Sequence, residues 1–239
     1  MMPRGFIVAL QHLTRIPAPP LSDFRPEDIA REKVFFPAVG LVIGCILAGI
    51  SWYLSTYSPW IGAIFVVLAW VWITGALHLD GLGDVADALG AAHRDPDRFH
   101  DVLKDPRAGN FAVVAISLQI AAKLALIANI PAALLPLSLV PIPAWARWGV
   151  LVWSAALPAL KPGLGATVGS RNSLTATVAW ALGLGAASFV LSPRLLVSLI
   201  VVAAILVYWR WRLGSITGDC LGASIEITEA ILLALLIIP

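Results

Sequence analysis

The sequence predicts an all-α protein that crosses a membrane repeatedly, as a polytopic bundle of about seven transmembrane helices preceded by a short N-terminal interfacial helix. The composition is the first reason, because 59% of the residues are hydrophobic and only 13% are charged, with a mean hydropathy of +0.89. A soluble domain of this size carries about twice that charged fraction. The second reason is the length of the apolar runs. Residues 34–57 and 58–79 contain no Asp, Glu, Lys or Arg, and each run could cross about 30 Å of hydrocarbon as a helix.

The apolar runs give the expected elements in order. A helix over residues 4–16 has an arginine near each end and is followed by prolines, and it is too short to span a bilayer, so we expect it at the interface. Turns that contain proline separate the longer runs. We expect one integral membrane domain over residues 1–239. Its predicted transmembrane helices are 34–57, 58–79, 109–130, 134–158, 174–192, 195–211 and 221–239.

The distribution of charge predicts the orientation in the membrane. If seven spans alternate, thirteen of the 16 Lys and Arg residues fall on one side and only Arg194 falls on the other, while Lys123 and Arg147 lie within spans. Loops rich in Lys and Arg stay in the cytoplasm, so we expect the N-terminus and the acidic segment 78–109 to be cytoplasmic. The nearly uncharged external side argues against an outward-facing receptor, and we expect no nucleic-acid partner.

An acidic face follows directly after an apolar run, in Asp80-Gly-Leu-Gly-Asp84-Val-Ala-Asp87. At about 100° per residue, Asp80, Asp84 and Asp87 lie within roughly 60° of one helical face. Carboxylates this close together at a membrane boundary repel one another unless a cation is bound, and oxygen ligands suit Mg²⁺ or Mn²⁺ rather than zinc. We therefore expect these three residues to hold a metal and to act on phosphates at the membrane surface.

The remaining acids of this segment leave two interpretations open. Asp95, Asp97 and Asp101 fit a solvated loop with helix-capping aspartates, since exposed charge is the ordinary case. Asp105 and Arg107 precede the next span and are equally consistent with a cap and with an active site, where a planar guanidinium would bind phosphate oxygens in pairs.

A second group of acids, Asp219, Glu226 and Glu229, heads the last apolar run. Asp219 and Glu226 are two helical turns apart, Glu226 and Glu229 are one turn apart, and both glutamates should lie within the bilayer thickness, where ionisable residues are usually functional. A compatible alternative is that the glutamates are neutralised by Lys123 or Arg147, which also lie in spans. Lys123 is more typical of a structural partner, whereas Arg147 fits an ion pair and a phosphate ligand equally.

Four weaker signals complete the sequence. Gly163-Leu-Gly165 could approach a nucleotide backbone, but such a pair of glycines is weakly specific. Gly40-x-x-x-Gly44 is typical of close helix packing. The ten Trp residues are expected mainly as interfacial anchors. His78 is expected to hydrogen bond to the aspartate two residues later.

Six stretches of the sequence form an ordered set. They are Leu13-Thr14-Arg15-Ile-Pro17, Phe36-Pro37-Ala-Val-Gly40-Leu, His78-Leu-Asp80-Gly-Leu-Gly-Asp84-Val-Ala-Asp87, Lys104-Asp105-Pro-Arg107-Ala-Gly109, Gly163-Leu-Gly165 and Gly218-Asp219-Cys-Leu-Gly222-Ala-Ser-Ile-Glu226-Ile-Thr-Glu229. Together they resemble the cobalamin synthase family, the adenosylcobinamide-GDP ribazoletransferases, over nearly the whole chain. Gly83 stands where that family usually has Ala, and Pro106 stands where Ser is common. Neither departure removes a carboxylate.

The resemblance implies a reaction in which adenosylcobinamide-GDP and α-ribazole, or its 5′-phosphate, give adenosylcobalamin, or its 5′-phosphate, and GMP. On this hypothesis Mg²⁺ held by Asp80, Asp84 and Asp87 bridges the phosphates, and Asp219 or Glu226 completes the metal site. One carboxylate, with Asp87 as the candidate, accepts the proton of the attacking hydroxyl. The residues expected to contact substrate are Asp105, Arg107, Arg147, Gly163, Gly165, Asp219 and Glu229.

The same resemblance implies an enzyme of the cytoplasmic membrane of a bacterium or archaeon, surrounded by lipid, and it leaves a homo-oligomer open. Two other functions fit parts of the sequence. A CDP-alcohol phosphotransferase also uses aspartates and Mg²⁺ on helices, but its pattern places Asp where Leu77 stands here. A cation transporter would use intramembrane acids, but the acids gather at one face and the external side offers no ligands.

Overall fold

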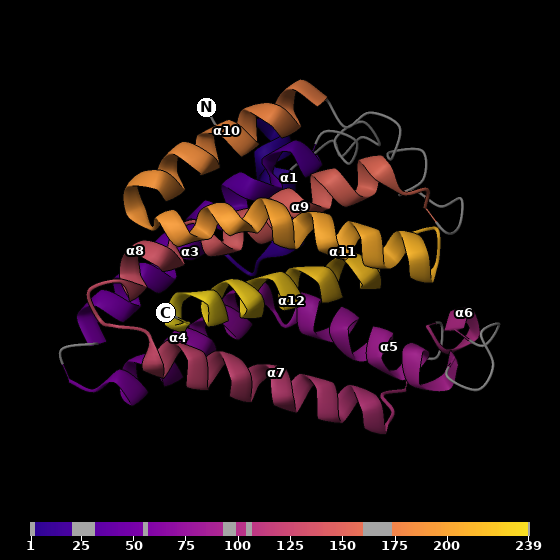
Figure 1. Cartoon of the computed structure of the whole chain (residues 1–239), viewed down its shortest axis with the longest axis horizontal. Coiled ribbons are helices and arrows are strands. Elements are labelled where there is room, and N and C mark those ends of the chain that lie inside the picture. Colours follow the sequence, from indigo (N-terminus) through magenta and orange to yellow (C-terminus); the bar gives the residue numbers. More distant parts are fainter. Residues whose placement is uncertain are drawn as a thin grey trace.

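The computed structural model describes residues 3–20, 32–54, 57–92, 99–103, 107–159 and 174–238, and the elements formed by these residues are helices (Figure 1). The predicted all-α bundle is therefore confirmed; no β-strand occurs in the described ranges, which contain one isolated bridge between Ala159 and Ile216. The helices in chain order are α1 Arg4–Leu13, η1 Lys33–Phe35, α3 Phe36–Leu54, α4 Pro59–Thr74, α5 Leu77–Ala92, α6 Phe99–Val102, α7 Asn110–Asn129, α8 Leu135–Leu139, α9 Ile142–Ala156, α10 Leu174–Leu191, η4 Pro193–Val197, α11 Ser198–Arg212 and α12 Gly218–Ile237.

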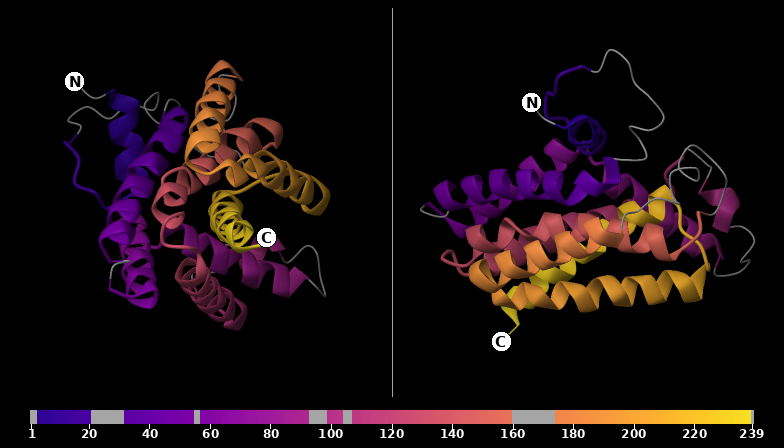
Figure 2. Two further views of the ribbon diagram at one scale, coloured as in Figure 1. Left: turned by 60° about the vertical axis from the view of Figure 1, so that its left-hand side comes forward. Right: turned by 90° about the horizontal axis from the view of Figure 1, so that it is seen from above.

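Helix α12 lies at the centre of the bundle, where it packs against α5, α7, α9 and α11 (Figure 2). Helices α9 and α12 bury most of their length, whereas α7 and α10 expose most of theirs. Because the exposed faces of α7 and α10 are apolar, we expect them to contact lipid.

The helix ends that carry the charged segments gather at one end of the molecule. The C-terminal ends of α5, α9 and α11 lie there together with the N-terminal ends of α7, α10 and α12, on the right in Figure 1. Both predicted acidic motifs, at the start of α12 and along α5, therefore belong to neighbouring antiparallel helices that are far apart in the sequence.

The predicted span 58–79 is wrong over its last five residues, because α4 ends at Thr74 and α5 leaves it at an angle of 86°. The cause is a pair of residues in the left-handed conformation, Gly75 with φ 62° and Ala76 with φ 61°. The Ala76 N–H donates to the Val71 carbonyl at 3.0 Å, which caps the end of α4. The described chain thus has six helices long and apolar enough to span a membrane, and seven if α4 and α5 count as one broken span.

The predicted helix-packing motif holds α3 against the segment that leads into α9. A Cβ added at Gly40 would lie 2.5 Å from the Ala144 Cα and 2.6 Å from the Pro143 carbonyl oxygen. A Cβ added at Gly44 would collide with the carbonyl oxygen of Val140. The absent side chains therefore allow the two backbones to touch, as in other close helix pairs of membrane proteins.

The Trp residues divide between surface and core, so the expectation of interfacial anchors is only partly correct. Trp52, Trp60, Trp72 and Trp211 are exposed, but five others are buried, namely Trp70, Trp145, Trp148, Trp153 and Trp209. The buried indoles have polar partners for their N–H groups in several cases: Trp145 donates to Ser188 at 2.9 Å, Trp153 to the Val202 carbonyl at 2.9 Å and Trp209 to Ser224 at 2.7 Å. Such partners make a large amphipathic side chain suitable for a core.

The short N-terminal helix predicted over 4–16 is present as α1 and packs along α3. It is tied to the start of η1 by His12, whose Nδ1 lies 3.1 Å from the Glu32 Oε1. The hydrogen bond to Glu32 raises the pKa of His12 above its ordinary value of 6.5.

The close contact at Gly44 gives a first prediction. We expect Gly44→Ala to lower the free energy of unfolding by about 1–3 kcal/mol, because the added Cβ has no room beside the Val140 carbonyl. Gly49→Ala is the matched control, since it lies on the same helix with nothing within 4 Å of an added Cβ. Thermal unfolding of the two purified variants in detergent checks this, and an equal response of both would contradict the close-packing account.

The pair of His12 and Glu32 gives a second prediction, with its sign set by the raised pKa. Because the pKa of His12 is higher in the folded state, its protonation stabilises the fold below pH 6.5, and this contribution is lost as the pH rises through the raised value. We expect the stability advantage of the wild type over Glu32→Gln to be largest at acidic pH and to shrink at higher pH. Thermal unfolding of both proteins across the titration range of histidine measures it, and a difference that does not vary with pH would exclude the pair as its source.

Candidate active site

Helix α5 carries the acidic face that the sequence predicts. Asp80, Asp84 and Asp87 occupy successive turns of this one helix. The Asp80 side chain is exposed, and those of Asp84 and Asp87 are half-buried. The charges of Asp80 and Asp87 both act on the Asp84 carboxyl, as expected for three residues that share a face.

The first turn of α12 brings a fourth carboxylate, Asp219, beside this face. Two glycines allow the approach: a Cβ at Gly81 would lie 2.9 Å from the Asp219 carbonyl oxygen, and one at Gly222 would lie 3.4 Å from the backbone of α5. Because the two helices touch backbone to backbone here, Asp219 is close enough for electrostatic interaction with both Asp80 and Asp84. The predicted association of the two acidic motifs is thus present at Asp219.

The charges of this cluster have no neutralising partner among the described residues. In the part of the chain that the structure describes, no Lys, Arg or His forms an ion pair with Asp80, Asp84 or Asp219. Among the described residues, no set of three His, Cys, Asp or Glu side chains is close enough to enclose a metal ion. Oxygen donors of this kind fit a divalent cation that is shared with a phosphate group, because Mg²⁺ usually takes one or two protein carboxylates and fills its other positions with water and substrate phosphate.

Asp87 is engaged differently from the other three carboxylates. Its Oδ2 accepts a hydrogen bond from the Gly109 N–H at 2.6 Å, and its Oδ1 accepts one from the Ala112 N–H at 3.1 Å. Both donors belong to the start of α7. The metal-binding and base roles expected for Asp87 therefore compete with a contact that the sequence did not predict.

The other predicted residues of the cytoplasmic segments are described only in part. Arg107 is exposed and lies two residues before Gly109, at the same end of the bundle as the carboxylates. Asp105, Gly163 and Gly165 lie outside the described residues.

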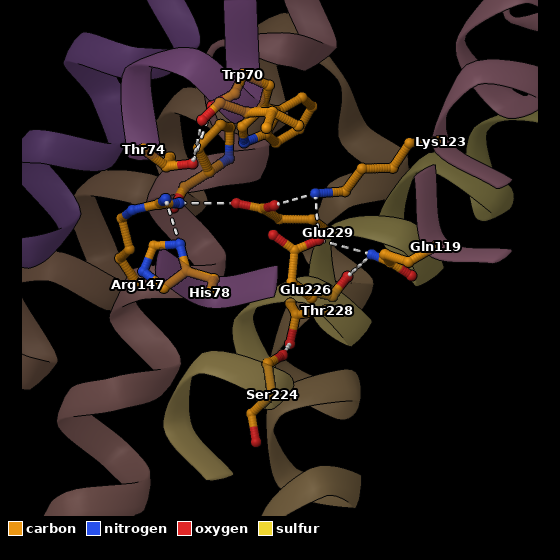
Figure 3. A network of polar contacts seen from close by, with 12 residues as sticks. Trp70, Thr74, His78, Gln119, Lys123, Arg147, Ser224, Glu226, Thr228 and Glu229 are labelled. Carbon is orange, nitrogen blue, oxygen red and sulfur yellow. Dashed lines mark hydrogen bonds and ion pairs between the residues drawn. The ribbon is translucent and has the colours of Figure 1, made fainter. Parts of the chain in front are cut away.

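Below the acidic face, charged side chains from three helices form a buried network (Figure 3). Glu229 accepts a hydrogen bond from the Lys123 Nζ at 2.7 Å and another from the Arg147 Nη1 at 2.7 Å. Glu226 accepts from Lys123 at 2.7 Å and from the Gln119 side chain at 2.9 Å. Two cations thus balance two carboxylates among side chains that are at most 6% exposed.

The network is satisfied at most of its polar atoms. Arg147 also donates to the Pro143 carbonyl at 3.0 Å, and the Lys123 ammonium lies 4.4 Å from the centre of the Trp70 ring. Within the described residues, the Arg147 Nε and the His78 Nε2 have no hydrogen-bond partner. Buried charges are tolerated only when they are paired and hydrogen bonded to this extent, so each charge depends on the others.

The profile of one protein family, described as cobalamin-5-phosphate synthase, matches residues 5–237. This chain belongs to the cobalamin-5-phosphate synthase family. The match covers α1 to α12, and therefore both the acidic face and the buried network.

Individual relatives of this synthase family are similar along their whole length and are named adenosylcobinamide-GDP ribazoletransferase. The relative from Thiobacillus denitrificans is 47% identical over 234 residues, which cover 97% of this chain and 94% of the relative. Those from Novosphingobium aromaticivorans and Laribacter hongkongensis are 45% and 42% identical, covering 96% and 98% of this chain and 94% and 97% of the relatives. No solved structure matches the chain.

In this member of the synthase family, the structure separates the predicted site residues into two groups. Arg147, which fitted an ion pair and a phosphate ligand equally, is fully buried and bonded to Glu229, which favours the ion pair. Glu226 and Glu229, expected as a metal ligand and a substrate contact, are bonded to Lys123, which favours the alternative of neutralisation. The acids left open for chemistry are those at the end of the bundle.

Two polar residues near the network were assigned wrongly or missed. His78 does not bond to Asp80; its Nδ1 lies 3.4 Å from the Arg147 Nη2. The reason is helical phase, because residues two apart point to opposite sides of a helix. Gln119, which bridges to Glu226, was missed, although its spacing of four from Lys123 places two polar residues on one face of an apolar span.

The buried network of this synthase-family chain gives a third prediction. We expect Lys123→Met to lower the free energy of unfolding by about 3–5 kcal/mol, because one Arg is left to balance two buried glutamates. Adding Glu226→Gln to this variant restores the charge balance and should recover part of the loss. Thermal unfolding in detergent and the amount of membrane-inserted protein measure both effects, and a double variant no more stable than Lys123→Met would show that charge imbalance is not the cause.

Proposed function

We propose that this chain is an adenosylcobinamide-GDP ribazoletransferase, which joins adenosylcobinamide-GDP to α-ribazole, or to its 5′-phosphate, and releases GMP. The observation that carries the proposal is the group of carboxylates of Asp80, Asp84 and Asp219, which no described cation neutralises, at one end of a membrane bundle. The names of the relatives supply the substrates. The carboxylates supply a reason for a diphosphate substrate, since such a cluster needs a divalent cation and a diphosphate brings one.

The ion expected is Mg²⁺, and one or two of the carboxylates of Asp80, Asp84 and Asp219 would hold it, with water and phosphate oxygens as the other ligands. When bound, it would offset negative charge on the diphosphate and on the departing GMP.

The remaining work of the reaction falls to side chains. As the ribazole hydroxyl attacks phosphorus and the bond to GMP breaks, Asp80 or Asp84 accepts the hydroxyl proton. The exposed guanidinium of Arg107 binds phosphate oxygens, and Asp105 with the Gly163-Leu-Gly165 stretch contributes further contacts to substrate.

The same proposal fixes the setting of the enzyme. The acidic end lies in the cytoplasm with the N-terminus, in the cytoplasmic membrane of a bacterium or archaeon. Support comes from Arg210 and Arg212 at the end of α11, which place positive charge at the acidic end of the bundle, as cytoplasmic loops do.

The carboxylate cluster gives a fourth prediction. We expect Asp80→Ala and Asp84→Ala each to lower transfer on the order of 100-fold or more, because a metal contribution of several kcal/mol is lost, while the protein still inserts into membranes. Asp101→Ala is the matched control, since it removes an exposed aspartate of α6 from the same end of the molecule. Near-normal turnover of the first two variants at limiting Mg²⁺, with an unchanged half-saturating Mg²⁺ concentration, would reject the metal role.

The assay that tests the function itself is GMP release by purified protein from GDP-cobinamide. Release should require both ribazole and Mg²⁺. Release without ribazole would indicate hydrolysis instead of transfer. No release, together with ion flux in proteoliposomes, would favour a transporter.

A further inference from the structure

The carboxylate of Asp87 occupies the start of α7 in place of a local cap. Helix α7 begins after Gly109, whose lack of a side chain leaves the first N–H groups of the helix without a capping oxygen from that residue. Asp87 accepts from Gly109 itself and from Ala112, three residues further on. These are the two N–H groups that a capping box satisfies within one helix, so α5 provides to α7 what the α7 sequence lacks.

The fit between the two helices depends on the glycine. A Cβ at Gly109 would lie 2.6 Å from the Asp87 Oδ1 and 2.9 Å from its Cγ. A residue with any side chain at this position would therefore displace the carboxylate. The negative charge also lies at the positive end of the α7 dipole, which strengthens the contact.

We propose that Asp87 is a positioning residue rather than a metal ligand or a base: by capping α7 it holds Arg107 beside the carboxylates of Asp80 and Asp84. Asp84 is one turn from Asp87 on the same face of α5. Arg107 is two residues from Gly109, so its backbone lies within about 7 Å of the capped amide. The capping contact thus determines how far the guanidinium can be from the acidic face.

This inference rests on the proposed function, because the role of Arg107 is to bind the diphosphate of the substrate. The proposed function and the capping role of Asp87 are contradicted by different results. If wild-type protein releases no GMP in the presence of both substrates, the proposed function fails, and the capping contact is still tested by the exchange of amide hydrogens.

The test compares two isosteric changes on one helix, Asp87→Asn and Asp84→Asn. An asparagine side chain keeps one of the two acceptor oxygens for the N–H groups at the start of α7 and loses the other, so we expect Asp87→Asn to keep its turnover within about tenfold of wild type. Asp84→Asn removes a charge that the proposed metal needs and should lose on the order of 100-fold. If Asp87→Asn does not insert into membranes, Asp87→Ser, which keeps an acceptor oxygen, takes its place.

Removing the acceptor altogether should act through Arg107. We expect Asp87→Ala to raise the KM for GDP-cobinamide about tenfold or more, since charge-assisted phosphate contacts are misplaced, and to leave the KM for ribazole and the half-saturating Mg²⁺ concentration unchanged. In an Arg107→Ala background the same change should have no further effect on KM, because the two residues act as a unit. Independent, multiplicative effects would overturn the coupling.

Hydrogen exchange supplies the readout that does not depend on catalysis. The amides of Gly109 and Ala112 should both exchange faster in Asp87→Ala than in wild type, whereas Asp87→Asn, which keeps one of the two acceptor oxygens, should retain the protection of one of them. Unchanged exchange in Asp87→Ala would overturn the cap. Loss of activity in Asp87→Asn equal to that in Asp84→Asn, with a raised Mg²⁺ requirement, would show instead that Asp87 is a metal ligand.

Discussion

The contact of Glu229 with both Lys123 and Arg147 is the constraint on which the arrangement of the bundle depends. If one of these helices shifts, one of these buried charges loses its partner. An unpaired charge in a low-dielectric interior costs several kcal/mol, so the network opposes such a shift. The contact joins α7, α9 and α12. Asp219 lies ten residues away on α12, so its distance from the network along the helix axis is about 15 Å. The acidic face is thus assembled on helices whose registers are already fixed.

Acids of the same type have different tasks along α12 because their surroundings differ. Glu226 and Glu229 form ion pairs with cations on neighbouring helices, which neutralise their charge. Asp219, two turns earlier, interacts with the carboxylate of Asp80 across the glycine contact with α5 and forms no ion pair within the described residues. Glu226 and Glu229 are therefore suited to stabilise the fold. Asp219 and the neighbouring carboxylates of α5 are suited to bind a cation from outside the protein.

Much of this could be predicted from sequence, because it depends on local spacing. The apolar runs indicated the bundle, the spacing of Asp80, Asp84 and Asp87 indicated a helical face, and the interval between Gly40 and Gly44 indicated close packing. The charges inside spans also indicated an ion pair, although they could not show which acid pairs with which base.

The failures share a different cause, since each depends on backbone conformation or on a distant partner. Hydropathy cannot detect the left-handed residues that end α4, so an uninterrupted span was expected across Gly75. The partner of Asp87 lies 22 residues further along the chain, and the acidic spacing says nothing about it. Two residues of one sequence motif can also point to opposite sides of a helix. His78 and Asp80 were expected to bond because they are close in sequence, but the helix separates their side chains.

The corner at Gly75 and Ala76 has a consequence for how the sequence can vary. In a continuous helix, each inserted or deleted residue rotates everything beyond it by about 100°. Here the left-handed pair resets the chain direction, so the rotational phase of α4 is not transmitted to α5. Residues can therefore be inserted into or deleted from α4 without rotating α5. The orientation of α5 is set instead by the helices that pack against it.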